Sequence, residues 1–153
     1  MTNPMRERYF EDYRVGESVE FGDHLVTERE IIDFATVYDP QPFHIDPAAA
    51  ARTHFGGLIA SGWLTGSILM RMLVDHFISP VASMGSPGID ELRWLAPVRP
   101  GDRLRARVTV LAARRSESKP DRGLLQALQE VVNQNDEVVM SMRSWGIYKV
   151  RAQ

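Results

Sequence analysis

The sequence contains no cysteine among its 153 residues, which excludes disulfides, thiolate metal sites and a cysteine nucleophile. Long hydrophobic runs are also missing. The longest apolar stretch, around residues 63–78, is interrupted by Arg71, Asp75 and His76, so it is too short and too charged to span a bilayer. The formal net charge of −2 provides no global basic field that would attract nucleic acid or an anionic membrane.

The length suits one domain with its own hydrophobic core. The sequence has no internal repeat, no low-complexity tract and no linker long enough to separate domains. Its N-terminus is polar and lacks the apolar core of a signal peptide. We therefore expect a single domain over residues 1–153, located in the cytoplasm, with residues 1–9 as a flexible N-terminal segment.

Three helices are predicted in the first half of the chain. Thr27 and Glu30 form a capping-box pattern before a helix that must end at Tyr38 or Asp39, because Pro40 forbids its continuation. A short helix is expected over residues 47–53, with its proline in the first turn. Residues 61–77 predict the longest helix, which is apolar nearly all round and is therefore expected to be buried.

The second half of the chain is typical of β-structure. Strands are predicted over residues 89–95, 104–112, 124–133 and 137–150, in addition to an early strand over residues 19–26. The predicted strand over residues 104–112 alternates strictly. One of its faces carries Leu104, Ala106, Val108, Val110 and Ala112. Helices followed by a run of antiparallel strands indicate an α+β fold, with a curved sheet wrapped around one long buried helix, the hotdog architecture.

An acid and an imidazole, Asp39 and His44, stand five residues apart on a loop that contains Pro40 and Pro42. Each proline fixes its own φ and moves the preceding residue out of the α region, so no helix can run from Asp39 to His44. We expect a rigid, non-repeating backbone that holds a general acid and a general base at a fixed separation. The alternative is that this segment simply ends a helix and turns the chain.

This loop and the residues after it resemble the signature of the MaoC-like acyl dehydratases, which include the (R)-specific enoyl-CoA hydratases. The family loop reads Asp-x-Asn-Pro-(apolar)-His-x-Asp, followed by a short Ala-rich helix, a Phe and a glycine that begins a long helix. Residues 92–102 are similar to the family's (apolar)-x-Phe-x-x-Pro-Val-x-Pro-Gly-Asp element, and residues 10–17 to its entry segment. Two departures are visible. Gln41 replaces the usual Asn, and Ser61-Gly62-Trp63 replaces the His-Gly-Met of many hydratases.

The resemblance implies a hotdog subunit that pairs into a dimer or a dimer of dimers. It implies that Asp39 and His44 are the catalytic pair, and that the Gly62 amide stabilises the thioester oxygen as it takes up enolate charge. The expected reaction is reversible hydration of a 2-enoyl-CoA, in fatty acid metabolism, with no cofactor beyond coenzyme A as the carrier. The first amides of a helix lack intrahelical acceptors, so the segment from Ser61 to Trp63 suits the oxyanion role on physical grounds as well.

Alternatives remain for several residues. Ser61 is also an ordinary N-cap, and Trp63 either narrows the acyl pocket or is simply core. His54 is a candidate to line the site or is structural, Asp46 is expected to cap the helix that follows it, and Asp102 reads as turn chemistry. The scattered histidines predict no metal site. A basic cluster near one turn either meets coenzyme A phosphates or is solvated surface; it consists of Arg114, Arg115, Lys119 and Arg122.

Two rival functions stay open. A hotdog acyl-CoA thioesterase usually employs a carboxylate in the long helix, but the only acid well inside that helix is Asp75, about 20 Å from its start at 1.5 Å per residue. A non-catalytic acyl-CoA-binding module would keep the groove without turnover, which the departures at Gln41 and Trp63 leave open.

Overall fold

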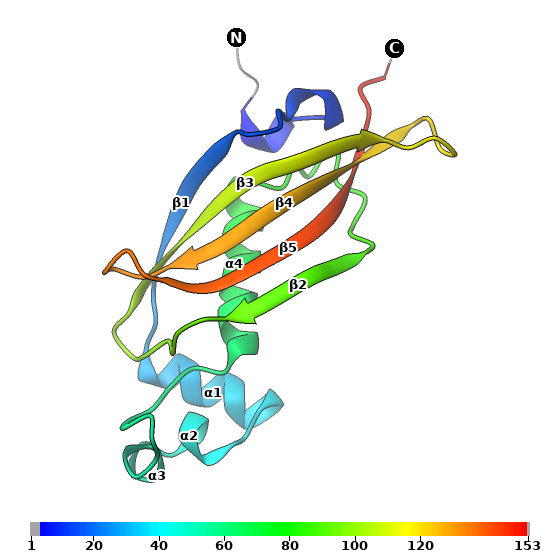
Figure 1. The fold of residues 1–153 in the computed structure, drawn as a ribbon. Helices are drawn as coiled ribbons and strands as arrows, with labels where there is room; N and C mark the ends of the chain where they lie inside the picture. The colour runs from blue at the N-terminus through cyan, green and yellow to red at the C-terminus, as the bar shows by residue number, and fades with distance from the viewer. Residues whose placement is uncertain (1–3, 153) are drawn as a thin grey trace.

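The computed structural model describes residues 4–152 and shows a curved antiparallel sheet with one long helix along its concave face (Figure 1). The strand order is β1-β3-β4-β5-β2, and every neighbouring pair is antiparallel. This arrangement confirms the predicted α+β class and hotdog architecture. The elements are η1 (Met5–Glu7), η2 (Phe10–Asp12), β1 (Ser18–Leu25), α1 (Glu28–Tyr38), α2 (Pro42–Ile45), α3 (Pro47–Ala51), α4 (Gly62–His76), β2 (Gly88–Trp94), β3 (Arg103–Arg115), β4 (Arg122–Val132) and β5 (Val138–Lys149).

Helix α4 packs one side against the sheet and leaves part of the other side uncovered. Its buried residues are Leu64, Thr65, Ile68, Leu69, Met72 and Leu73. By contrast, the exposed fractions are 60% for Trp63, 48% for Met70 and 43% for Val74. The prediction of a helix buried all round was therefore wrong for these three residues, because the sheet of a single chain covers only one side of it.

The concave face of β3 supplies much of the core. Leu104, Ala106, Val108 and Val110 are almost fully buried, as the alternating pattern predicts. The register shifts at a bulge between Val110 and Ala112. A bulge puts two residues opposite one and interrupts the alternation. Ala112, which is half-buried, therefore does not join the predicted buried row.

Helix α1 begins and ends where the sequence predicts. The Glu30 N–H donates to Thr27 Oγ1 at 3.1 Å, and the helix ends at Tyr38, two residues before Pro40. The second half of the capping box does not form, because the Glu30 carboxylate contacts His24 Nε2 at 2.9 Å instead. In Figure 1, helices α1, α2 and α3 gather at one end of the molecule, beyond the sheet and beside the start of α4.

The described part of the N-terminal segment is packed. Met5 and Tyr9 lie against the core, and Arg8 forms a 2.7 Å ion pair with Glu17. A segment expected to be flexible over residues 1–9 therefore makes specific contacts from residue 5 onward. The rest of that expectation, residues 1–3, lies outside the described residues.

Candidate active site

Asp39 and His44 come from two adjoining elements at the helical end of the molecule. Asp39 is the C-cap of α1, and its N–H donates to Ala35 O at 2.8 Å. His44 lies in α2, a single turn that begins at Pro42. No helix runs from Asp39 to His44, as predicted. The prediction of a non-repeating backbone was wrong for His44, however, because this residue lies in a helical turn. A proline is tolerated in the first turn of a helix, so Pro42 starts a new turn that carries the imidazole.

The two side chains face each other. His44 Nε2 lies 3.2 Å from Asp39 Oδ2, with the imidazole 6% and the carboxylate 20% exposed. On the other side of the ring, Nδ1 is 2.7 Å from the carbonyl oxygen of Ile59. A carbonyl oxygen only accepts, so Nδ1 carries a proton and donates it. This hydrogen bond fixes the tautomer of the neutral ring and leaves Nε2 as the atom that gains or loses a proton beside Asp39.

Donors around Asp39 keep its carboxylate ionised. Partial burial raises the pKa of Asp39, but hydrogen bonds from Gln41 and Ser61, and the charge that His44 carries when protonated, outweigh burial and hold the pKa below its ordinary value. Gln41 Nε2 donates to Oδ1 at 2.7 Å, which leaves Oδ2 toward the imidazole. The residue that departs from the family pattern therefore contacts the predicted catalytic acid directly.

The start of α4 presents a free amide beside this pair. Ser61 is fully buried and caps the helix, with its Oγ accepting from the Trp63 N–H at 3.3 Å. Its carbonyl oxygen accepts from Leu64 and Thr65 at 2.9 and 3.2 Å. Among the hydrogen bonds of residues 4–152, none uses the Gly62 N–H. The cap at Ser61 and a free amide at Gly62 thus exist together, as the sequence allows.

A cavity of about 290 Å³ joins these parts. His44 and Gly62 both line it, whereas Asp39 is not among its lining residues but contacts His44, which is. The other lining residues are predominantly apolar and come from the loop before α4, from α4 itself, from the end of β2 and the loop after it, and from β5. They are Phe55, Ile59, Ala60, Thr65, Trp94, Leu95, Ala96, Pro97, Val98 and Val139.

The tryptophan of the cavity is Trp94, which the sequence reasoning did not identify as a site residue. Trp63 does not line the cavity and is not core; its ring packs edge-on against Trp94 with centroids 5.1 Å apart. The signal for Trp94 was available, since it stands at the Phe position of the family's strand element. Of the neighbours His54 and Phe55, it is Phe55 that lines the cavity.

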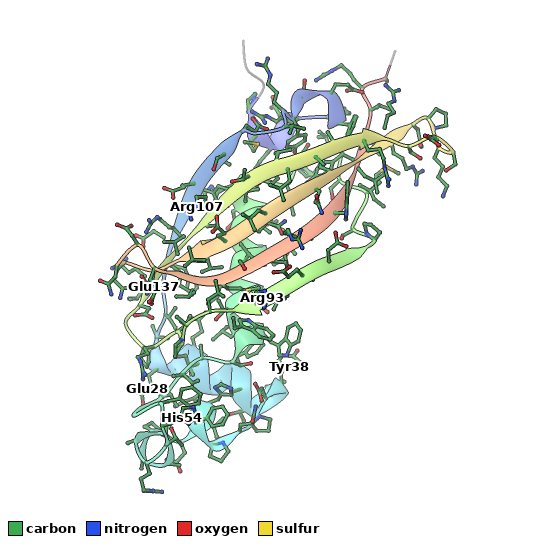
Figure 2. The ribbon with its side chains drawn as sticks, viewed as in Figure 1. Glu28, Tyr38, His54, Arg93, Arg107 and Glu137 are labelled. Atoms are coloured by element: carbon green, nitrogen blue, oxygen red, sulfur yellow. The ribbon has the colours of Figure 1, made fainter. Side chains whose placement is uncertain are left out.

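The remaining candidates lie outside this cavity. Figure 2 shows His54 and Tyr38, the neighbour of Asp39, at the helical end of the molecule. The His54 ring packs on Phe55 with centroids 4.0 Å apart rather than entering the cavity. Asp46 caps α3 by accepting from the amides of Ala48 and Ala49, as predicted. Asp102 accepts from the Arg99 N–H at 2.9 Å within its turn.

The basic cluster lies at the β3–β4 hairpin, at the opposite end of the sheet from α1–α3 (Figure 1). Within it, Arg114 lies over the Trp145 ring and Arg122 pairs with Asp121 at 2.9 Å. The cluster is therefore not part of the cavity wall of the same chain. Within residues 4–152, no group of three histidine or acidic side chains is placed to hold a metal ion, and no helix is long and apolar enough to cross a membrane.

The fold and the site together define a hotdog domain in which a paired carboxylate and imidazole and a free helix-terminal amide lie at or beside an apolar cavity. A family model described as MaoC like domain matches residues 11–133, so the chain belongs to the MaoC-like dehydratase family. That match spans the Asp39–His44 loop and every residue that lines the cavity except Val139.

Known proteins agree with this assignment. The chain is 33% identical over 111 residues to a 3-hydroxybutyryl-CoA dehydratase of Methylorubrum extorquens, covering 72% of this chain and 68% of that protein. It is 32% identical over 108 residues to Protein MaoC of Klebsiella aerogenes, where the match covers 70% of this chain but only 31% of the longer protein.

Solved structures agree as well. The crystal structure of a MaoC-like dehydratase from Rhodospirillum rubrum superposes with a TM-score of 0.89 at 39% identity, covering 95% of this chain and 99% of that one. A Mycobacterium tuberculosis protein described as a double hotdog fold superposes with a TM-score of 0.83 at 16% identity, covering 96% and 46%, which supports the fold alone.

Proposed function

We propose that the protein hydrates 2-enoyl-CoA thioesters reversibly, and thus also dehydrates 3-hydroxyacyl-CoA thioesters. The observation that carries this proposal is the placement of His44 Nε2, 3.2 Å from Asp39, at a cavity that also receives the unbonded Gly62 amide. The kinship with a 3-hydroxybutyryl-CoA dehydratase supports the same reaction class. Addition of water needs a group that takes a proton from the water, a proton donor for C2 and a stabiliser for the enolate.

The Gly62 amide is the proposed stabiliser. As water attacks C3, electrons move onto the thioester oxygen, which becomes an enolate. The first N–H groups of a helix point outward, and the helix macrodipole adds partial positive charge there. Because Ser61 already satisfies the amides of Trp63, Leu64 and Thr65, the Gly62 N–H is in place before the reaction and needs no reorganisation.

The Asp39–His44 pair is the proposed proton carrier. With Nδ1 donating to Ile59, neutral His44 accepts the proton of the attacking water at Nε2, and the ionised Asp39 carboxylate holds the same water. The O–H bond of the water breaks as its oxygen bonds to C3. The pair then returns that proton to C2 of the enolate, so no net proton is consumed. One water that serves both carbons from one side gives syn addition.

The uncovered side of α4 supports the pairing of two copies of the chain. Strand β2 is at an edge of the sheet, and the apolar side chains of Met70, Val74 and Ile89 are 48%, 43% and 52% exposed beside it. Exposed apolar side chains next to an open strand edge favour pairing with another chain. We propose that two copies pair here into a continuous sheet, as a homodimer or as half of a dimer of dimers. A cytoplasmic location, and a reaction that needs no cofactor besides the coenzyme A carrier, stay predictions.

Incubation with crotonyl-CoA tests the function against its rivals. A hydratase removes the ultraviolet absorbance of the conjugated enoyl thioester without releasing thiol, and the product is 3-hydroxybutyryl-CoA. Release of free coenzyme A would instead indicate a thioesterase. Tight binding with neither change would indicate an acyl-CoA-binding module. Either of these two outcomes, repeated over a panel of enoyl-CoAs of different length and branching, would contradict the proposal.

A further inference from the structure

One buried hydroxyl in the cavity has no partner in the protein. Thr65 is 2% exposed and lines the same cavity as His44 and Gly62. Its N–H is bonded to the Ser61 carbonyl, but no hydrogen bond among residues 4–152 uses its Oγ1. Among those residues, no fully enclosed side-chain nitrogen or oxygen lacks a partner. The small accessible part of Thr65 therefore includes the hydroxyl, and the space it opens to is the cavity.

Other hydroxyls on helices of this protein behave differently. Thr36 Oγ1 donates to Ile32 O at 2.7 Å, and Ser67 Oγ donates to Trp63 O at 2.8 Å, each bonding the carbonyl four residues earlier. That bond is the usual local solution for threonine and serine in a helix. Thr65 forgoes it, although the Ser61 carbonyl lies four residues before it. A ligand that displaces solvent from this hydroxyl must supply a hydrogen-bond partner, because a hydroxyl left unpaired in a closed site is destabilising.

The position of Thr65 relative to Gly62 indicates which part of a ligand it meets. The two residues are three apart on the same face of α4, about 4.5 Å along the helix axis at 1.5 Å per residue. With the thioester oxygen on the Gly62 amide and C3 at His44, Thr65 lies beside the acyl chain beyond the reacting carbons. Of the residues that line the cavity, His44 is the only one with a charge to gain, so no fixed cation is present there for a carboxylate.

We infer that Thr65 is a specificity-determining residue, and that the site prefers acyl chains carrying an uncharged oxygen, such as an ether or hydroxyl, a few atoms beyond C3. This inference rests on the proposed function for the orientation of the thioester. The Thr65 hydroxyl donates to the ligand oxygen, whereas an all-carbon chain leaves the hydroxyl unsatisfied. A hydrocarbon chain still fits the apolar walls, but without that hydrogen bond.

The test compares two thioesters that cannot be hydrated, 4-methoxybutanoyl-CoA and hexanoyl-CoA. They have acyl chains of equal length, and the ether oxygen of the first replaces one methylene group of the second. Calorimetry gives the two dissociation constants for the wild-type protein, Thr65→Val and Thr65→Ser. We expect the preference for the ether, as a ratio of dissociation constants, to fall about two- to tenfold in Thr65→Val, the effect of one neutral hydrogen bond. Comparing ratios cancels the different hydration of the two free ligands.

Two variants control for structural effects. Thr65→Ser keeps a hydroxyl and should retain the wild-type ratio, while Thr36→Val removes a helical hydroxyl outside the cavity and should leave both constants unchanged. An identical ratio in wild type and Thr65→Val overturns the inference, as does failure of the wild-type protein to bind either thioester. Turnover of crotonyl-CoA is measured separately, so absence of hydration would overturn the proposed function while the binding ratio still decides the role of Thr65.

Discussion

The indole N–H of Trp94 donates to the carbonyl oxygen of Gly62 at 2.9 Å, and the ring fills the space that a side chain at position 62 would need. Strand β2 and the first residue of α4 are thus joined at the cavity. Glycine is required at this point because the aromatic ring approaches the backbone, not because of an unusual φ angle. The same contact fixes the residue whose amide is proposed to stabilise the enolate.

Gly62→Ala should therefore be harmful where an equivalent change one turn later is not. A Cβ at position 62 would overlap the Trp94 indole, so we expect a loss of about 1–3 kcal/mol in the free energy of unfolding and a clear loss of hydration activity. Gly66→Ala is the matched control, since its Cβ would meet only Met140 at an ordinary 3.7 Å. It should be neutral or stabilising by up to about 1 kcal/mol. Urea unfolding and crotonyl-CoA assays check both; equal effects in the two variants would contradict the role of the Trp94 contact.

Loss of either member of the acid–base pair should stop turnover without unfolding the protein. Asp39→Asn and His44→Ala are each expected to lower kcat at least about a hundredfold, the usual effect of removing an acid–base group. Asp33→Asn, on an exposed part of α1, should keep wild-type activity. Circular dichroism confirms the fold of each variant. Near-wild-type rates from Asp39→Asn or His44→Ala would disprove the mechanism.

Gln41→Ala should raise the pKa of Asp39, because it removes a donor to the ionised carboxylate. In the wild type that pKa lies below its ordinary value, so the stability it contributes is present above about pH 4 and is lost as the pH falls through the lower, folded-state value. The stability difference between wild type and Gln41→Ala should consequently shrink on acidification. Carboxyl titration by NMR and urea unfolding at several pH values measure both effects. A carboxyl that titrates at the same pH in the two proteins would refute this account of Gln41.

The native mass should be two or four times the 17.3 kDa mass of one chain. Met70→Glu puts a charge on the uncovered side of α4 and is expected to shift the protein toward monomer, since a buried unpaired charge is costly at an interface. Val37→Glu, at a side chain 68% exposed on α1, should leave the mass unchanged. Analytical ultracentrifugation measures the mass. A wild-type protein that sediments as a monomer at micromolar concentration would exclude the proposed pairing.

Local patterns predicted much of this fold because their physics is local. The end of α1 before Pro40, the caps at Thr27 and Asp46, and the buried row on β3 each depend on a few neighbouring residues. The pairing of Asp39 with His44 was also within reach, since the family motif and the two prolines constrain the loop. The turn at Pro42, in contrast, was misjudged because the same residue type that ends one helix also begins another.

The sequence by itself determined the class of fold, the order of its elements and the chemistry-bearing loop, because proline geometry, capping and side-chain alternation act over a few residues. Only the tertiary structure decided which tryptophan lines the cavity, which side of α4 stays uncovered and that the Thr65 hydroxyl opens into the site. Those facts depend on how β2, α4 and the loop before α4 approach one another. Contacts between residues far apart in the chain produce no periodic pattern in the sequence, so local patterns do not predict them.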